Sequence, residues 1–247
     1  MAGSETVIEV RRLFALAEFS EAVKLQQCVW GFPDSELLPL RFFVVATRIG
    51  GQVFGAYDAA KMIGFCLAIP GVKAGGKAYL HSHMLGVLPA YRNAGVGRRL
   101  KLEQRADALK RGFDLVEWTF DPLEVKNAFF NIESLGVIVR QYAENEYGIS
   151  SSPLHGGLPT DRCVAEWWIA SPRVDAFVNG KRPERRIEER ITVPAKIGVW
   201  RSKQPSRARE IQSANAVRFR ECFARGLAVI GFERNPDEGA YLLGPAE

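Results

Sequence analysis

Residues 81–100 read HSHMLGVLPAYRNAGVGRRL, and two of the chain's three histidines alternate there, just ahead of a glycine-containing turn. The alternating apolar residues over 78–88 predict a strand that ends at Pro89. From residue 96 on, apolar residues recur among charged ones until Gly112, which predicts an amphipathic helix. The stretch therefore predicts a strand, a turn and a helix in direct succession.

The sequence before this stretch predicts one helix and several strands. A short strand over 7–10 precedes helical spacing over 14–30, which Gly31 and Pro33 bring to an end. Three β-rich runs follow, and the turn residues between them predict antiparallel hairpins. These runs cover residues 42–49, 52–58 and 62–70.

The sequence after the stretch alternates strands with helices. The expected strands are 113–120, 137–148 and 162–170, the helices are 123–136 and 206–225, a loop covers 150–161, and a hairpin covers 226–244. We expect an α/β (α+β) fold with a mixed, mostly antiparallel central sheet flanked by helices. Residues 1–171 would form the core, and 172–247 a C-terminal extension packed on it, irregular over 172–205 and then a helix and a β-hairpin.

Composition narrows the class of protein. With 247 residues, 47% of them hydrophobic and 25% charged, the chain can bury a core and lacks the signature of disorder. No apolar run reaches about 18 residues, and Glu5 and Glu9 stand where a secretory signal would be apolar. The four cysteines stand singly, which favours reduced thiols. We expect a cytoplasmic protein without a membrane span.

The net charge of +5 indicates an anionic partner. Much of the positive charge lies in residues 181–220, where acidic residues are interleaved and aromatic residues are few. This pattern is more typical of a solvated surface than of a nucleic-acid site. We therefore do not expect nucleic acid as a partner.

The turn after the predicted strand has the chemistry of an anion site. Its glycines allow backbone N–H groups to converge at a helix N-terminus, where the helix dipole adds positive potential. Four basic side chains raise this potential further: Arg92, Arg98, Arg99 and Lys101. The Walker pattern GxxxxGK[ST] and the dinucleotide pattern GxGxxG are both absent. The turn predicts a pyrophosphate site, and a tight turn without a ligand is the alternative.

The segment RNAGVG at 92–97 resembles motif A, R/Q-x-x-G-x-G/A, of the GNAT superfamily of N-acetyltransferases. The similarity covers about residues 78–140 and, more loosely, the N-terminal elements. It implies a GNAT-like fold and a site for acetyl-CoA or another acyl-CoA, in which the strand bonds the pantetheine arm through its backbone. The binding residues it implies are Leu85, Gly86, Val87, Arg92, Asn93, Ala94, Gly95, Val96, Gly97 and Arg98.

Alternation places His81 and His83 on one face of the strand together with Leu85 and Val87, with the imidazoles roughly 6.5 to 7 Å apart. An amine must lose a proton before it attacks a thioester, and histidine is suited to accept it. Polar strand residues bonded to their neighbours are one alternative. A second alternative is that the two histidines bind a metal ion together. The sequence offers no identifiable third ligand, so no metal site is expected.

The two histidines are similar in spacing to the His-x-His strand of the arylalkylamine N-acetyltransferases. That resemblance implies His81 as the catalytic base and His83 as a proton relay. The chain as a whole looks like a little-characterised bacterial branch of the superfamily, in which segments such as WTFDP and LPTDR recur.

The helix after the fifth strand departs from the family pattern. Counted back from Gly136, Val125 replaces the usual asparagine and Ile132 replaces the tyrosine that protonates the departing thiolate. Asn127 or Asn131 is then expected to contact the cofactor. Tyr142 or Tyr147 is expected to supply the proton, with simple packing of these tyrosines as the alternative.

Together these features predict an acyl-CoA-dependent N-acyltransferase that moves an acetyl or other short acyl group to a small-molecule amine by direct attack. A catalytically degenerate CoA-binding module, regulatory or structural, is the alternative, since the usual tyrosine and asparagine are missing. The C-terminal third would line the acceptor pocket, close a homodimer or extend the sheet.

Overall fold

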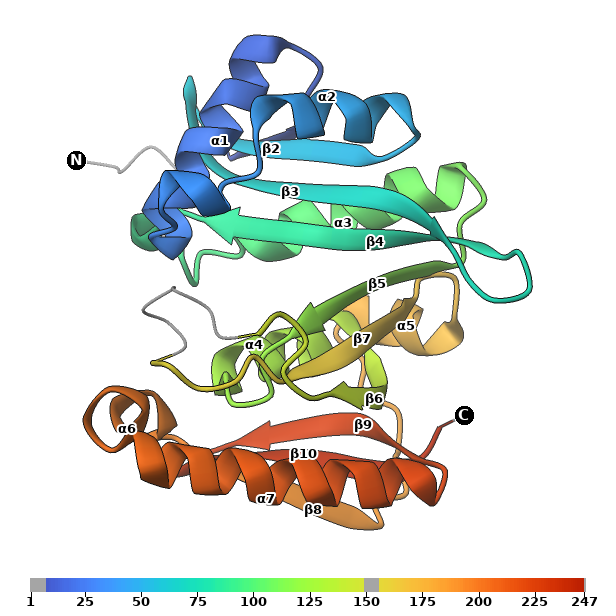
Figure 1. Ribbon diagram of the computed structural model, residues 1–247. Coiled ribbons are helices and arrows are strands. Elements are labelled where there is room, and N and C mark those ends of the chain that lie inside the picture. The colour runs from blue at the N-terminus through green and yellow to red at the C-terminus, as the bar shows by residue number, and fades with distance from the viewer. Residues whose placement is uncertain (1–7, 149–155, 247) are drawn as a thin grey trace, which may run out of the picture. The chain divides into compact units, whose positions relative to one another are not determined.

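The structure, a computed structural model, describes residues 8–148 and 156–246 (Figure 1). The chain divides into two compact units, Met1–Val116 and Glu117–Glu247. The division lies earlier in the chain than the boundary we expected after residue 171. Residues 172–247 share their unit with 117–171, because β9 (Leu227–Arg234) pairs with β6 (Ile138–Ala143). Part of the expected loop over 150–161 lies outside the described residues, as does His155.

The first unit contains a wholly antiparallel sheet in the order β1-β2-β3-β4. Its strands are β1 (Glu9–Arg12), β2 (Gln52–Asp58), β3 (Lys61–Val72) and β4 (Ala78–Val87). Successive side chains of β2 and β3 point to opposite faces, and both faces are buried. The expected strands over 52–58, 62–70 and 78–88 are therefore confirmed.

Helices cover both faces of this sheet (Figure 1). One hydrophobic cluster lies under α1 (Leu16–Trp30) and α2 (Leu40–Arg48) and includes Phe19, Phe43 and Phe65. The other lies under α3 (Val96–Lys110) and is built from Val96, Leu100 and residues of β2 and β3. Two short 3₁₀ turns complete the unit, η1 (Asp34–Glu36) and η2 (Pro89–Tyr91).

The strand that we expected over 42–49 is wrong, because this run forms most of α2. The helix begins after Pro39 and buries Phe43 and Ala46, three residues apart, while Val45 and Ile49 stay exposed. A continuous apolar run of this length is compatible with a strand or a buried helix, and its β-branched residues favoured the strand. Packing on the sheet decides for the helix.

The second unit contains a sheet in the order β5-β7-β6-β9-β10-β8, and the pairs β7/β6, β6/β9, β9/β10 and β10/β8 are antiparallel. The strands not yet given are β5 (Leu115–Phe120), β7 (Arg162–Trp168), β8 (Glu189–Pro194) and β10 (Glu238–Pro245). The helices are α4 (Val125–Phe129) with the π-helical turn η3 (Phe130–Ser134), α5 (Pro172–Val178), α6 (Ile197–Lys203) and α7 (Pro205–Ala224). Residues 172–205, expected to be irregular, thus contribute two helices and an edge strand.

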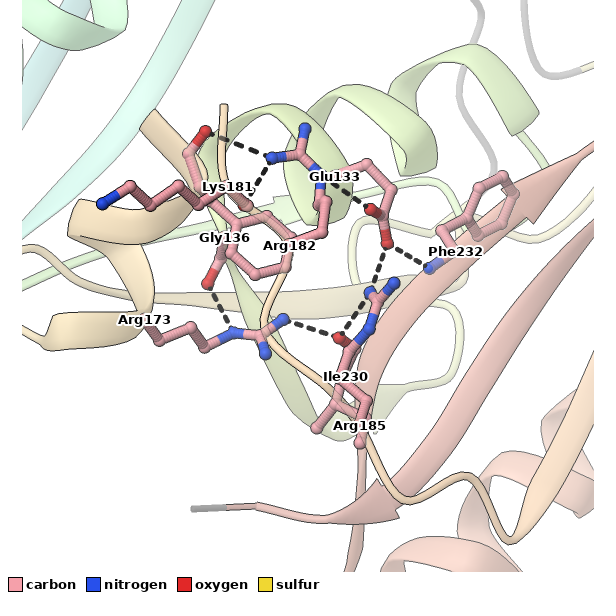
Figure 2. A network of polar contacts seen from close by, with 9 residues as sticks. Glu133, Gly136, Arg173, Lys181, Arg182, Arg185, Ile230 and Phe232 are labelled. Carbon is pink, nitrogen blue, oxygen red and sulfur yellow. Dashed lines mark hydrogen bonds and ion pairs between the residues drawn. The ribbon is translucent and has the colours of Figure 1, made fainter. Parts of the chain in front are cut away.

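A buried carboxylate organises the start of this C-terminal region. Figure 2 shows Glu133 of η3 between two guanidinium groups, with Nη1 of Arg185 at 2.6 Å and Nε of Arg182 at 3.3 Å. The same carboxylate accepts the backbone N–H of Phe232 at 2.8 Å, and Glu133 is only 6% exposed. Both guanidinium groups also lie over the ring of Phe177. The basic segment, residues 181–220, is therefore not only the solvated surface that we expected. Two of its arginines also link α5, η3 and β9.

We predict that Glu133→Gln lowers the free energy of unfolding of the second unit by about 2 to 4 kcal/mol, because two guanidinium groups lose their buried counter-charge. Urea unfolding followed by tryptophan fluorescence and circular dichroism measures it. Glu188→Gln is the matched control, since Glu188 pairs with the exposed Arg186 and should change stability by less than about 0.5 kcal/mol. Equal effects of the two substitutions would contradict the role of Glu133.

Candidate functional site

The turn between β4 and α3 presents backbone N–H groups to an open space. Gly95 caps α3 in the left-handed conformation (φ 76°), and Asn93 also has a positive φ of 65°. The first N–H groups of a helix have no partner within it, and no acidic residue stands in the first turn of α3 to neutralise them. Apart from Gly95 and its two chain neighbours, no atom of residues 8–148 and 156–246 lies within 4 Å of the place where a Cβ on Gly95 would stand. These features fit an anionic group such as a diphosphate.

The arginines of the turn are used differently from our expectation. Arg92 lies back across the end of the strand, where its Nε donates to the carbonyl of Val87 at 3.2 Å and its Nη2 to that of Val29 at 3.3 Å. Arg99 donates to the carbonyl of Ile8 at 2.8 Å. These side chains hold the turn against neighbouring elements and still add positive charge to it. The fold also offers the backbone amides at the start of α3 as anion donors.

Strand β4 carries a β-bulge between the two parts of the predicted site. Ser82 pairs with Ala68 and Met84 with Leu67, so His83 is one residue too many for its partner strand. After the bulge, Leu85 and Val87 pack into the cluster beneath α3. The expectation that these two share a face with the histidines is therefore wrong, because a strict two-residue period ignores the inserted residue.

The two histidines lie side by side on the α1/α2 side of β4. Their ring centroids are 5.9 Å apart, and the ring of His83 lies 6.1 Å from that of Phe42 on α2. His81 is half-buried, whereas His83 reaches solvent. The predicted proximity of the two imidazoles is thus what the structure shows.

The surroundings keep His81 neutral. Burial, with the charges of His83, Lys101 and Lys73, lowers its pKa to about 4. The pKa of His83 is also lowered, by burial among its neighbours, although part of its side chain is exposed. At neutral pH the ring of His81 is therefore unprotonated and is a weaker base than an ordinary imidazole.

A buried lysine beneath the bulge was not recognised as such from the sequence. Lys101 is 2% exposed, and its Nζ lies 2.8 Å from Oγ of Ser82 and 3.0 Å from Oε1 of Gln104. Burial lowers the pKa of Lys101 to about 7. The spacing of residues 97, 101, 104 and 108 places all four on one stripe of α3, but only the fold decides that this stripe faces the sheet. The sequence pattern instead predicts that the charge of Lys101 lies at the turn.

Two other candidate residues lie in the second unit. Asn127 is exposed, and its Oδ1 accepts from Nδ2 of the buried Asn131 at 3.3 Å, whose own Oδ1 accepts from the indole of Trp118. Residues 130–134 form a π-helical turn, whereas the count back from Gly136 assumed an α-helical turn there. Ile132 is fully buried there.

Tyr142 is a packing residue of the second unit. Its hydroxyl donates to Oδ2 of Asp161 at 2.7 Å, and its ring stacks on Phe219 of α7 at 5.3 Å. Burial and this carboxylate raise the pKa of Tyr142 far above its usual value. Both facts argue against the role of proton donor that we expected for it.

Within residues 8–148 and 156–246, no group of three or more His, Cys, Asp or Glu side chains could hold a metal ion. Over the same residues, no helix combines the length and apolar character that crossing a membrane requires.

Comparisons with known proteins were made by sequence and by fold. Residues 19–131 match the model of the acetyltransferase (GNAT) family. No curated protein matches the chain by sequence.

Solved structures share the fold at low sequence identity. The ribosomal-protein-S18-alanine N-acetyltransferase of Escherichia coli is 19% identical, with 67% of this chain and 96% of that one covered and a TM-score of 0.53. YncA of Salmonella typhimurium, solved with its cofactor acetyl-CoA, is 14% identical, with 67% and 97% covered and a TM-score of 0.54. NAA60 of Arabidopsis thaliana, in complex with a bisubstrate analogue, is 14% identical, with 66% and 98% covered and a TM-score of 0.52.

The matching residues 19–131 include the turn, the bulged strand and α3, and the fold of the chain agrees with that of the solved acetyltransferases. The chain therefore contains an acetyltransferase (GNAT) domain, which the family model matches at residues 19–131.

Proposed function

We propose that this acetyltransferase moves an acetyl or other short acyl group from acyl-CoA to the amine of a small-molecule acceptor by direct attack. The observation that carries the proposal is that one strand, β4, bears two adjacent histidines and leads directly into the amide-lined turn. A proton acceptor and an anion site thus stand on one continuous segment. Acetyl-CoA, the cofactor named for YncA, presents a diphosphate and a thioester that suit these two parts.

The turn would hold the diphosphate through the amides at the start of α3, from Gly95 to Arg98. Arg92 keeps these amides in place by bonding the end of β4. The backbone of β4 after the bulge, at Leu85 to Val87, would bond the pantetheine arm and polarise the acyl carbonyl. When bound, acyl-CoA supplies the acyl group as a thioester.

His81 would act as the base. Its neutral ring accepts the proton of the acceptor amine as the C–N bond forms and the C–S bond breaks, and His83 passes that proton to solvent. The thiolate of CoA takes its proton from water, because Tyr142 is bound to Asp161. All atoms and protons of this acyl transfer are then accounted for, and the step requires neither a metal nor a redox partner.

A CoA-binding module without chemistry is the second candidate. The engagement of Tyr142 and the low basicity of His81 favour it. Both candidates require CoA binding, and release of free thiol in the presence of amines separates them. Nucleic-acid binding receives no support, because Arg182, Arg185 and Arg201 of the basic segment take part in ion pairs within their own unit.

We predict that Ala94→Glu weakens binding of coenzyme A by about tenfold or more, because an added carboxylate repels the diphosphate at the helix N-terminus. Isothermal titration calorimetry measures the dissociation constant. The control, Ala106→Glu, adds the same charge to an exposed position further along α3 and should change the constant less than about twofold. Similar losses in both variants would contradict binding at the turn.

We predict that His81→Gln lowers kcat by about 100-fold or more, since a general base contributes on the order of 10² to 10⁴. The dissociation constant of CoA should stay within about twofold. His83→Gln removes only the relay and should cost less. Thiol release with a panel of amines measures both, and a His81→Gln variant with wild-type kcat on every accepted amine contradicts the assignment.

The titration of His81 is a separate test. Because its pKa is lowered to about 4, its ring should remain neutral from pH 7 down to about pH 5 and take up a proton only below that. Imidazole carbon shifts in NMR spectra, assigned with the His81→Gln variant, report this directly. A midpoint near 6.5, the ordinary value for histidine, would show that the ring is not buried as described.

A further inference from the structure

The bulge at His83 needs a support that the β-ladder does not supply. A bulge leaves one residue out of register and disrupts the hydrogen bonding between the strands around it. On the α1/α2 side, the ring of Phe42 packs near that of His83. On the α3 side, the residue just before the bulge is Ser82, which is 5% exposed.

Lys101 reaches Ser82 from α3. Its Nζ lies 2.8 Å from Oγ of Ser82, and one turn further along the helix Gln104 accepts from the same Nζ at 3.0 Å. This contact joins the last strand position before the bulge to the helix that begins at the amide-lined turn. One side chain thus connects the two parts of the proposed site.

A lysine at this position is costly for packing alone. The neighbouring buried residues Leu100 and Ala108 are apolar, and an unbranched apolar side chain would fill the space of Lys101 without desolvating an amine. Cys66 of β3 influences the pKa of Lys101. Across the strand, Lys101 influences the pKa of His81, as does Lys73, which follows the end of β3. The buried amine therefore indicates a role beyond packing.

Ser82 and Lys101 could in principle form a nucleophilic pair. Both are almost completely buried beneath α3, so neither is placed to meet an acyl group. Their contact is better explained as a means of holding the strand.

We propose that Lys101 is a positioning residue, which fixes the bulge in β4 through its hydrogen bond to Ser82 and thereby sets the placement of His81 and His83. The effect on the strand follows from the contacts alone. The effect on catalysis rests on the proposed function.

The test uses the full chain with Lys101→Met, which keeps the length of the stem and removes the amine, with Ser82→Ala, and with the double variant. Lys110→Met, at an exposed lysine of the same helix, is the control. Ser82→Thr keeps the hydroxyl and serves as the conservative variant. Four readouts are compared: the melting temperature, the dissociation constant of coenzyme A, kcat, and the imidazole NMR signals of His81 and His83.

We expect Lys101→Met to melt no lower than the wild type and to bind CoA within about twofold, while kcat falls about tenfold to 100-fold, because small misplacements of reacting groups are costly. The His83 signals should shift, and the pKa of His81 should rise, since a neighbouring positive charge is lost. Ser82→Ala should cause the same loss of kcat, and the double variant no further loss. Ser82→Thr should retain most of the activity.

Unchanged histidine signals in a folded Lys101→Met variant would overturn the proposal, as would additive losses of kcat in the double variant. A purely structural role would lower the melting temperature and leave the histidine signals unmoved in Ser82→Ala, which keeps the charge of Lys101. If the wild-type chain transfers no acyl group to any amine, the proposed function fails, and the histidine signals still decide whether Lys101 positions the strand.

Discussion

The extra residue in β4 is the constraint on which the arrangement of the site depends. Without the bulge at His83, strict alternation would place the histidines and Leu85 on the same face of the sheet. The inserted residue moves the side chains that follow it to the opposite face. The histidines therefore lie towards α2, whereas Leu85 and Val87 pack under α3. The strand can thus present titratable side chains on one face and lead at its end to the turn at the N-terminus of α3.

Charge is divided between the surface and the interior in a way that net charge does not reveal. Arg92 and Arg99 bond backbone carbonyls around the turn, and Lys101 lies buried behind the strand. The helix N-terminus, rather than any one side chain, is left to attract an anion. In the second unit Glu133 pairs with Arg182 and Arg185, which the sequence pattern alone predicts to be solvated. Most of these basic residues thus make structural contacts, and those at the turn, Arg92 and Arg99, still add positive potential there.

Much of the fold could be predicted from the sequence because its signals were local. The alternation of β4, the glycines of the turn and the period of α3 each fix a local conformation. Three features were not predictable in this way. The helical state of residues 42–49 is decided by packing, the bulge at His83 by the register with β3, and the burial of Lys101 by the stripe of α3 that faces the sheet. Each depends on contacts between distant parts of the chain.

The most direct test of the account is an NMR titration of the ¹⁵N-labelled protein with coenzyme A, followed at the backbone amides. We predict that the largest shifts fall on residues 94–98, with smaller ones at residues 83–87, and that the amides of residues 94–98 fail to respond to pantetheine, which lacks the diphosphate. Shifts confined to other segments, or equal responses to both compounds, would contradict the claim that the turn after the bulged strand holds the diphosphate.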